Sequence, residues 1–237
     1  MNKKQEVLKK LDKVYDPELD EPLTDLNFID AININDNDVE VVFRLPTYWC
    51  SPNFAFIMAE DIKIYVSELD WVKNIRVRLL DHSASEEINS GVTEGKQFSE
   101  TFDGWSPSNG NLDDLRRTFR IKAFYSRQDR LVRFLRNMDY SKENIISMTL
   151  DELKALPLAE EGSVLRDKYL EKKTELNHPK TNIKAITDPE GKEISIEDIS
   201  DYLLGIKSTR ISMEFNGAYC KGLLETRYNL ETQKSNK

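Results

Sequence analysis

The chain has 237 residues, a formal net charge of −8, 39% hydrophobic residues and 32% charged residues. This composition fits a globular protein of one large or two small domains, and its negative charge argues against general nucleic-acid binding. No apolar run reaches the roughly 18 residues of a membrane span, and the basic start is not followed by the apolar core of a signal peptide. We therefore expect a cytoplasmic protein that binds neither membrane nor nucleic acid and keeps both its cysteines reduced.

The first predicted elements are a helix and a hairpin. Apolar residues at helical spacing predict an amphipathic helix over residues 2–14, which Asp16-Pro17-Glu18 ends because the residue before a proline disfavours helical angles. Alternating apolar residues predict strands at 28–34 and 39–45, joined by a turn at 35–38. Residues 14–43 carry nine carboxylates and no Lys or Arg. This acidic stretch is either a solvated surface or a binding face for a cation or a basic partner.

Cys50 follows the second predicted strand. Ser51 and Pro52 are an N-cap residue and a proline at the first helical position, and they predict a helix that runs to about residue 69. Unpaired amide groups and the positive end of the helix dipole favour a thiolate at such a place, and a thiolate attacks electrophiles and binds soft metals. The alternative is that Cys50 packs in the core, as free cysteines often do.

A third predicted strand, at residues 72–79, completes an α-β-β-α-β order. We expect an α+β sandwich in which helices cover one face of a small sheet. His82 lies at the end of this strand, where functional side chains often converge. With Cys50 and a carboxylate such as Glu86, it would form an incomplete iron or zinc site. Two alternatives stay open: a surface histidine without a ligand role, and a thiol-dependent enzyme that uses Cys50 and His82.

The remainder of the chain predicts a mainly helical extension. The expected division is a domain at 1–88 that folds alone, a loop-rich linker at 89–111 and the extension at 112–237. The extension begins with a basic helix from residue 112 toward 138. This helix either meets nucleic acid or an acidic partner, or it faces solvent or pairs with the acidic first domain. Helices at 144–156 and 164–176 follow, and a small mixed α/β end contains a helix at 196–204 and a strand at 210–215. Cys220, between two glycines, is either incidental or a second thiol near Cys50.

An ordered set of short motifs in the first third of the chain carries a resemblance. The set comprises Asp16-Pro17-Glu18-Leu19, Thr24-Asp25-Leu26, two strands, a Thr47-x-x-Cys50 step with a proline after it, a helix and a third strand. Over about residues 3–82 it resembles the metal-sulfur (iron-sulfur) cluster assembly domain family, which includes PaaD-like and SufT-like proteins and the eukaryotic cytosolic iron-sulfur targeting factors. Two positions differ from the family pattern. Asn27 replaces the usual glycine, and Trp49-Cys50-Ser51-Pro52 replaces a Gly-Cys-Pro step.

The resemblance implies a maturation factor rather than an enzyme, and the chain carries no Gly-x-Gly-x-x-Gly, phosphate loop or Cys-x-x-Cys motif. It implies transient binding of iron or an iron-sulfur cluster and delivery to a client apo-protein, together with the iron-sulfur assembly machinery. A homodimer would present two Cys50 thiolates. The alternative is a metal-free adaptor that helps to mature a multicomponent di-iron oxygenase. The expected cofactor-binding residues are Cys50, Asp16, Glu18 and Thr47, and the expected metal ligands are Cys50, His82 and Glu86.

Overall fold

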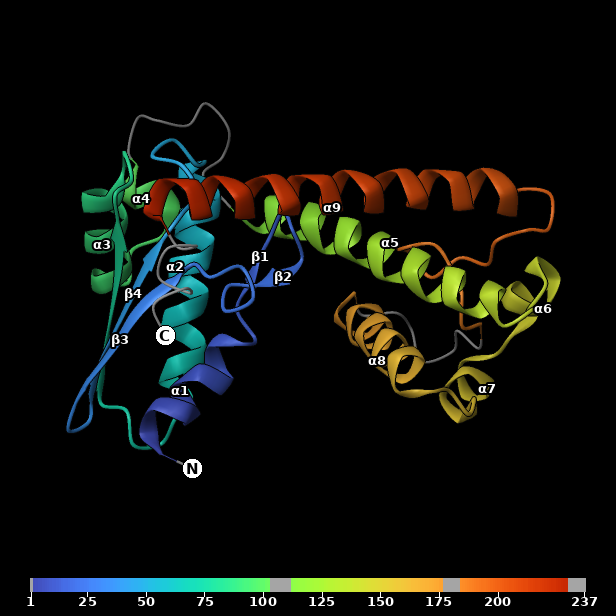
Figure 1. Cartoon of the computed structure of the whole chain (residues 1–237), viewed down its shortest axis with the longest axis horizontal. Coiled ribbons are helices and arrows are strands. Elements are labelled where there is room, and N and C mark those ends of the chain that lie inside the picture. The colour runs from blue at the N-terminus through green and yellow to red at the C-terminus, as the bar shows by residue number, and fades with distance from the viewer. Residues whose placement is uncertain (1, 103–111, 177–183, 230–237) are drawn as a thin grey trace. The chain divides into compact units, whose positions relative to one another are not determined.

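The structure is a computed structural model that describes residues 2–102, 112–176 and 184–229 (Figure 1). It divides into two compact units: residues 1–116 with 215–237, and residues 117–214. Two helices, α5 and α9, run from one unit into the other. The elements are α1 (Lys3–Leu11), β1 (Tyr15–Asp16), β2 (Glu21–Pro22), β3 (Ile29–Asn35), β4 (Asp38–Arg44), α2 (Pro52–Ser67), β5 (Asn74–Leu80), α3 (Ser85–Glu94), α4 (Phe98–Thr101), α5 (Asp113–Asn137), α6 (Lys142–Ser147), α7 (Leu150–Ala155), α8 (Glu160–Glu175) and α9 (Ile199–Tyr228).

The first unit is built on a three-stranded sheet of order β3-β4-β5. The β3–β4 hairpin is antiparallel and β4–β5 is parallel, which requires α2 to cross over between them. The predicted α+β class, with a mainly helical part after it, is confirmed. A second small sheet, in which β1 pairs with β2, was not predicted. Its strands are two residues long, too short to show an alternating pattern.

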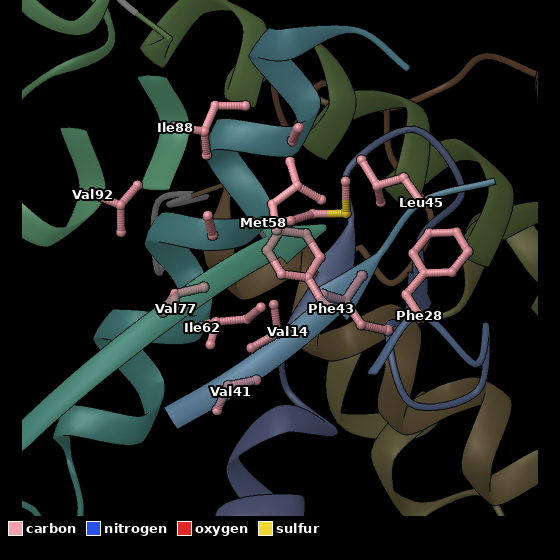
Figure 2. Close-up of a cluster of buried hydrophobic side chains, with 14 of the residues drawn as sticks. Val14, Phe28, Val41, Phe43, Leu45, Met58, Ile62, Val77, Ile88 and Val92 are labelled. Carbon is pink, nitrogen blue, oxygen red and sulfur yellow. The ribbon is translucent and has the colours of Figure 1, made fainter. Parts of the chain in front are cut away.

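Alternation along the central strand places the core on one face of the sheet. Val39, Val41 and Phe43 of β4 are buried in this core, whereas on the opposite face Glu40 and Arg44 are only partly buried and Val42 is buried. Met58 and Ile62 of α2 pack over the buried face (Figure 2). Burying each such side chain contributes roughly 1.5–3 kcal/mol, so the packing of α2 on the sheet is a main source of stability for this unit.

The predicted linker contains the second half of α3 and all of α4, and both helices belong to the first core. Val92 of α3 and Phe98 of α4 are buried in the same cluster as the sheet residues, and so is Phe102. The Phe98 ring meets Phe56 of α2 edge to face at 5.5 Å. The expected division at residue 88 falls inside α3, because the apolar face of that helix completes the cover of α2 and β5. The last part of the predicted linker, residues 103–111, lies outside the described residues.

The second unit is helical around its own core. The buried residues include Phe124 of α5 and Tyr169 of α8, whose rings lie 5.4 Å apart. The prediction that the basic side chains of α5 face solvent or acidic surfaces needs one correction. Arg127 is 3% exposed, and its guanidinium donates to the Lys168 carbonyl and to Glu171. Arg116, near the start of α5 in the first unit, forms ion pairs with Glu60 and Asp61. These pairs agree with the expectation that basic side chains of this helix meet acidic ones.

The predicted strand at residues 210–215 is wrong. These residues lie inside α9, a helix of 30 residues. The alternation of Ile211, Met213 and Phe215 suggested a strand, but burial follows a helical period, because Ile206, Arg210 and Met213 are the buried positions. The predicted helix at 144–156 is present as two short helices, α6 and α7, with Thr149 capping the second. In the portion of the chain described, no helix has the length and apolarity to span a membrane.

Candidate functional site

Cys50 lies in the turn between β4 and α2, immediately before the N-cap residue of α2. Pro52 is at the start of the helix as predicted, but the Ser51 side chain makes no capping hydrogen bond. The Cys50 thiol is half-buried, and its Sγ lies 3.3 Å from Oγ1 of Thr47. The same Oγ1 accepts a hydrogen bond of 3.3 Å from the Trp49 backbone N–H. Because a hydroxyl accepts from one group while donating to another, Thr47 is able to donate its proton to the sulfur.

His82 holds the backbone of this turn rather than the thiol. Its Nε2 lies 2.7 Å from the Cys50 carbonyl oxygen, and its Nδ1 accepts from the Ala84 N–H at 3.1 Å. This pattern assigns the proton to Nε2 of a neutral ring. Burial, the largest cause, and the nearby Arg227 lower the pKa of His82, which favours that neutral form. A second hydrogen bond, from the Ser83 backbone N–H to the Tyr48 carbonyl oxygen at 2.9 Å, also links the Cys50 turn to the segment around His82.

The predicted metal set of Cys50, His82 and Glu86 is not brought together. Both ring nitrogens of His82 are occupied by backbone groups, and Glu86 is exposed in the first turn of α3. Within residues 2–102, 112–176 and 184–229, no three side chains of His, Cys, Asp and Glu form a group suited to a metal ion. The thiol enzyme alternative also lacks its geometry, because His82 contacts the carbonyl of Cys50 rather than its sulfur.

Asp16 shapes a second turn. Its Oδ1 accepts from the Glu18 N–H at 2.8 Å and from the Leu19 N–H at 3.0 Å. An aspartate side chain commonly stabilises a turn in this way, by accepting from backbone N–H groups two and three residues later. The carboxyl group is 7% exposed, and burial raises its pKa to about 6 despite these two hydrogen bonds. Asp16 stands opposite Glu21 in the β1–β2 pair, so three carboxyl groups, those of Asp16, Glu18 and Glu21, gather at this end of the unit.

The last part of α9 packs against the first unit near both turns. Lys221 forms an ion pair with Glu21 at 2.5 Å, and Leu224 is 1% exposed in the first core. Arg227 donates to the Leu45 carbonyl at 3.2 Å and to the Asp81 carbonyl at 2.8 Å. Asp81, which has a φ of 53°, precedes His82, and Leu45 begins the segment that leads from β4 to Cys50. The end of α9 is therefore anchored on both sides of the Cys50 turn.

Cys220 lies on this anchored segment. Its thiol is half-buried and packs against the same core as Cys50. Burial raises the pKa of Cys220 to about 11, and the negative charges of Asp16, Cys50 and Glu18 add to the effect. Both cysteines therefore belong to the first unit and pack against its core. Nothing in the sequence around Cys220 distinguishes it from an incidental cysteine, since its partners are more than 150 residues away in the chain.

Exposed aromatic residues lie close to each of the two cysteines in the sequence. Trp49 is 78% exposed and Tyr48 is 45% exposed, and their rings meet edge to face with centroids 4.9 Å apart. On α9, Phe215 and Tyr219 are 71% and 61% exposed. A tryptophan so far out of the core is unusual for packing and typical of contact with a partner.

Comparison with known families supports the N-terminal resemblance. Residues 4–77 match the family described as iron-sulfur cluster assembly protein, which confirms the resemblance over this part of the chain and indicates a role in iron-sulfur cluster assembly. The match leaves the remainder of the chain unassigned. No curated protein matches the chain. One departure from the family pattern is explained by the backbone: Asn27 has a φ of 58°, a left-handed conformation that asparagine tolerates and glycine adopts freely.

Proposed function

We propose, from the iron-sulfur cluster assembly match of residues 4–77, that the protein is a maturation factor in which Cys50 transiently binds iron or a cluster and passes it to a client apo-protein. The observation that carries the proposal is the position of Cys50. Its thiol is accessible in a turn, next to the Thr47 hydroxyl and beside an exposed tryptophan. The part of the chain beyond the matched residues would contact the client.

The chemistry of the turn suits a carrier. The Thr47 hydroxyl lies within hydrogen-bonding distance of the Cys50 sulfur, and a thiolate sulfur is a ligand for soft metals. His82 fixes the backbone on which the thiol is mounted, so the sulfur keeps its place when cargo arrives and leaves. A resident cluster normally has four protein ligands. A site with fewer would hold its cargo weakly enough to release it.

The decisive experiment is anaerobic reconstitution with iron and sulfide. We expect the wild type to bind iron that chelators remove readily and that transfers to an apo-ferredoxin, and we expect Cys50→Ser to lose the transfer. Thr47→Val is the matched control for the hydroxyl: it should bind cargo but alkylate more slowly at Cys50. Peptide-resolved alkylation at pH 7 should also show Cys50 reacting faster than Cys220. Full client activity from Cys50→Ser in cells would refute the carrier mechanism.

A metal-free adaptor is the second candidate, and the exposed Tyr48–Trp49 pair favours it. Large aromatic side chains dominate the energetics of many protein interfaces. An adaptor would keep client activity in Cys50→Ser and lose it in Trp49→Ala. The carrier predicts the reverse order of severity. Charge reversal at Arg133, an exposed residue of α5, tests whether the extension contributes, whereas reversal at the buried Arg127 would disturb the second unit itself.

A further inference from the structure

The two parallel strands of the first unit separate just before the turn that carries Cys50. The last residue pair of the β4–β5 ladder is Arg44 with Leu80. The next residues along the two strands, Leu45 and Asp81, lie beyond the ladder, and Asp81 turns the chain with a left-handed φ of 53°. The carbonyl groups of these two residues are therefore the first backbone acceptors past the paired part of the sheet.

The side chain of Arg227, near the end of α9, bridges these two carbonyl groups. Its Nη1 donates to the Leu45 oxygen at 3.2 Å, and its Nη2 donates to the Asp81 oxygen at 2.8 Å. The guanidinium lies 5.1 Å from the centroid of the Tyr228 ring, and the guanidinium of Arg44 lies 4.9 Å from the same centroid. A planar cation that makes two hydrogen bonds and lies over an aromatic ring is held in one orientation. Arg227 therefore takes the place of a further ladder pair and fixes the separation of the two strand ends.

Two further hydrogen bonds join the same two chain segments beyond this bridge. The His82 ring meets the Cys50 carbonyl oxygen at 2.7 Å, and the Ser83 N–H donates to the Tyr48 carbonyl at 2.9 Å. Together with the bridge they form three successive cross-links between the chain that follows β4 and the chain that follows β5. Of the three, the one nearest the strands is supplied by α9.

We propose that Arg227 is a positioning residue of the Cys50 site: it holds the ends of β4 and β5 together and so keeps the turn, and with it the thiol, where cargo is bound. This inference rests on the proposed function of Cys50. It implies that residues 4–77 do not form the complete site, because Arg227 and His82 both lie outside them. It also gives the helical extension a role in binding cargo that does not depend on contact with a client.

Arg227→Met tests the inference, because methionine keeps an unbranched apolar side chain but has none of the donors. Cys50 alkylation and NMR-detected hydrogen exchange at the Ser83 N–H should each become roughly tenfold faster, because a hydrogen bond to a charged group contributes at least about this factor. Exchange within β4 reports the stability of the whole unit and corrects both rates for a general loss of stability. Lys221→Met is the matched control: it removes the other ionic anchor of the same helix end and should leave both corrected rates unchanged.

Cargo binding is measured separately, with ferrous iron under anaerobic conditions. Arg227→Met should bind iron roughly tenfold more weakly than the wild type, as is typical when a group that supports a metal ligand is removed, and Lys221→Met should bind it equally well. Unchanged rates at Cys50 and Ser83 in Arg227→Met would overturn the inference and leave the Cys50 carrier standing. Equal increases in the two variants would overturn it as well, since any loosening of α9 would then have the same effect. Failure of the wild type to bind iron would instead refute the carrier, and with it the role of Arg227 in cargo binding.

A second pair of variants keeps the inference testable if Arg227→Met folds poorly. Arg227→Lys retains a cation that donates hydrogen bonds to carbonyl groups, so both rates should stay near those of the wild type. Tyr228→Leu removes the ring over which the guanidinium lies, so both rates should rise. The opposite order of the two variants would overturn the inference.

Discussion

Replacing His82 by leucine tests how the Cys50 turn is held. Leucine fills much of the space of the ring but forms no hydrogen bonds. The Cys50 carbonyl would lose its bond of 2.7 Å and the Ala84 N–H its bond of 3.1 Å. A buried polar group that loses its partner costs about 1–3 kcal/mol. For the two groups together we therefore expect the first unit to lose roughly 2–6 kcal/mol of its free energy of unfolding, and Cys50 to be alkylated faster because its turn loosens.

The assay is urea unfolding followed by tryptophan fluorescence, because all three tryptophans precede residue 116 and report on the first unit. Asn89→Leu is a matched control. The Asn89 side chain also bridges two backbone groups, the N–H and the carbonyl of Leu79, at 2.7 and 3.1 Å. It should destabilise the unit by a similar amount and leave the alkylation rate of Cys50 unchanged. If His82→Leu changes neither stability nor that rate, the ring does not hold the turn.

The pH dependence gives a second readout of the same contact. Burial lowers the pKa of His82 in the folded protein, so the unfolded chain binds the proton more tightly. Stability from this group is complete above about pH 6.5, the ordinary pKa of histidine, and is lost as the pH falls below it. The difference in unfolding free energy between wild type and His82→Leu should therefore shrink on acidification. A difference that stays constant from pH 8 to pH 5 would contradict the neutral, buried ring.

Three further predictions concern other residues. Asp16→Asn keeps the acceptor of the turn but removes a carboxyl whose folded pKa of about 6 exceeds its ordinary 3.8. The stability of the wild type should fall as the pH rises from about 4 to 6, and the variant should be up to about 3 kcal/mol more stable than the wild type at pH 7. Equal pH profiles of the two proteins would refute the raised pKa. Lys173, which is 4% exposed and bonded to Thr187, has a pKa lowered from 10.5 to about 8 by burial. The second unit should therefore gain stability from pH 8 to 9.5, because the unfolded chain binds more protons than the folded chain in this range. Unfolding followed by circular dichroism should show no such gain in Lys173→Met. A fragment of residues 1–102 should unfold at higher urea than 1–88, which lacks Phe98 and Phe102; equal midpoints would mean that α3 and α4 add little to the core.

Much of the first unit was determined by sequence patterns that act over a few residues. Alternation along residues 39–45 requires a half-buried strand, and Ser51-Pro52 requires a helix to begin there, so the location of Cys50 between the two was predictable. The turn at Asp16-Pro17-Glu18 likewise depends on bonds within three residues. Local backbone preference and hydrophobic periodicity suffice for such features, because the interacting groups are neighbours in the chain.

Contacts between distant segments were decided only by the tertiary structure. His82 suggested a metal ligand by its place after a strand, but packing directs its ring to the Cys50 carbonyl, 32 residues away. The alternation of apolar residues at 210–215 suggested a strand, but the buried residues of α9 recur at helical spacing. Cys220 packs against the first core because a helix of 30 residues returns the chain to the first unit, where Lys221 and Arg227 fix it. No local pattern encodes that return, since it depends on the shape and charge of surfaces that exist only once both segments have folded.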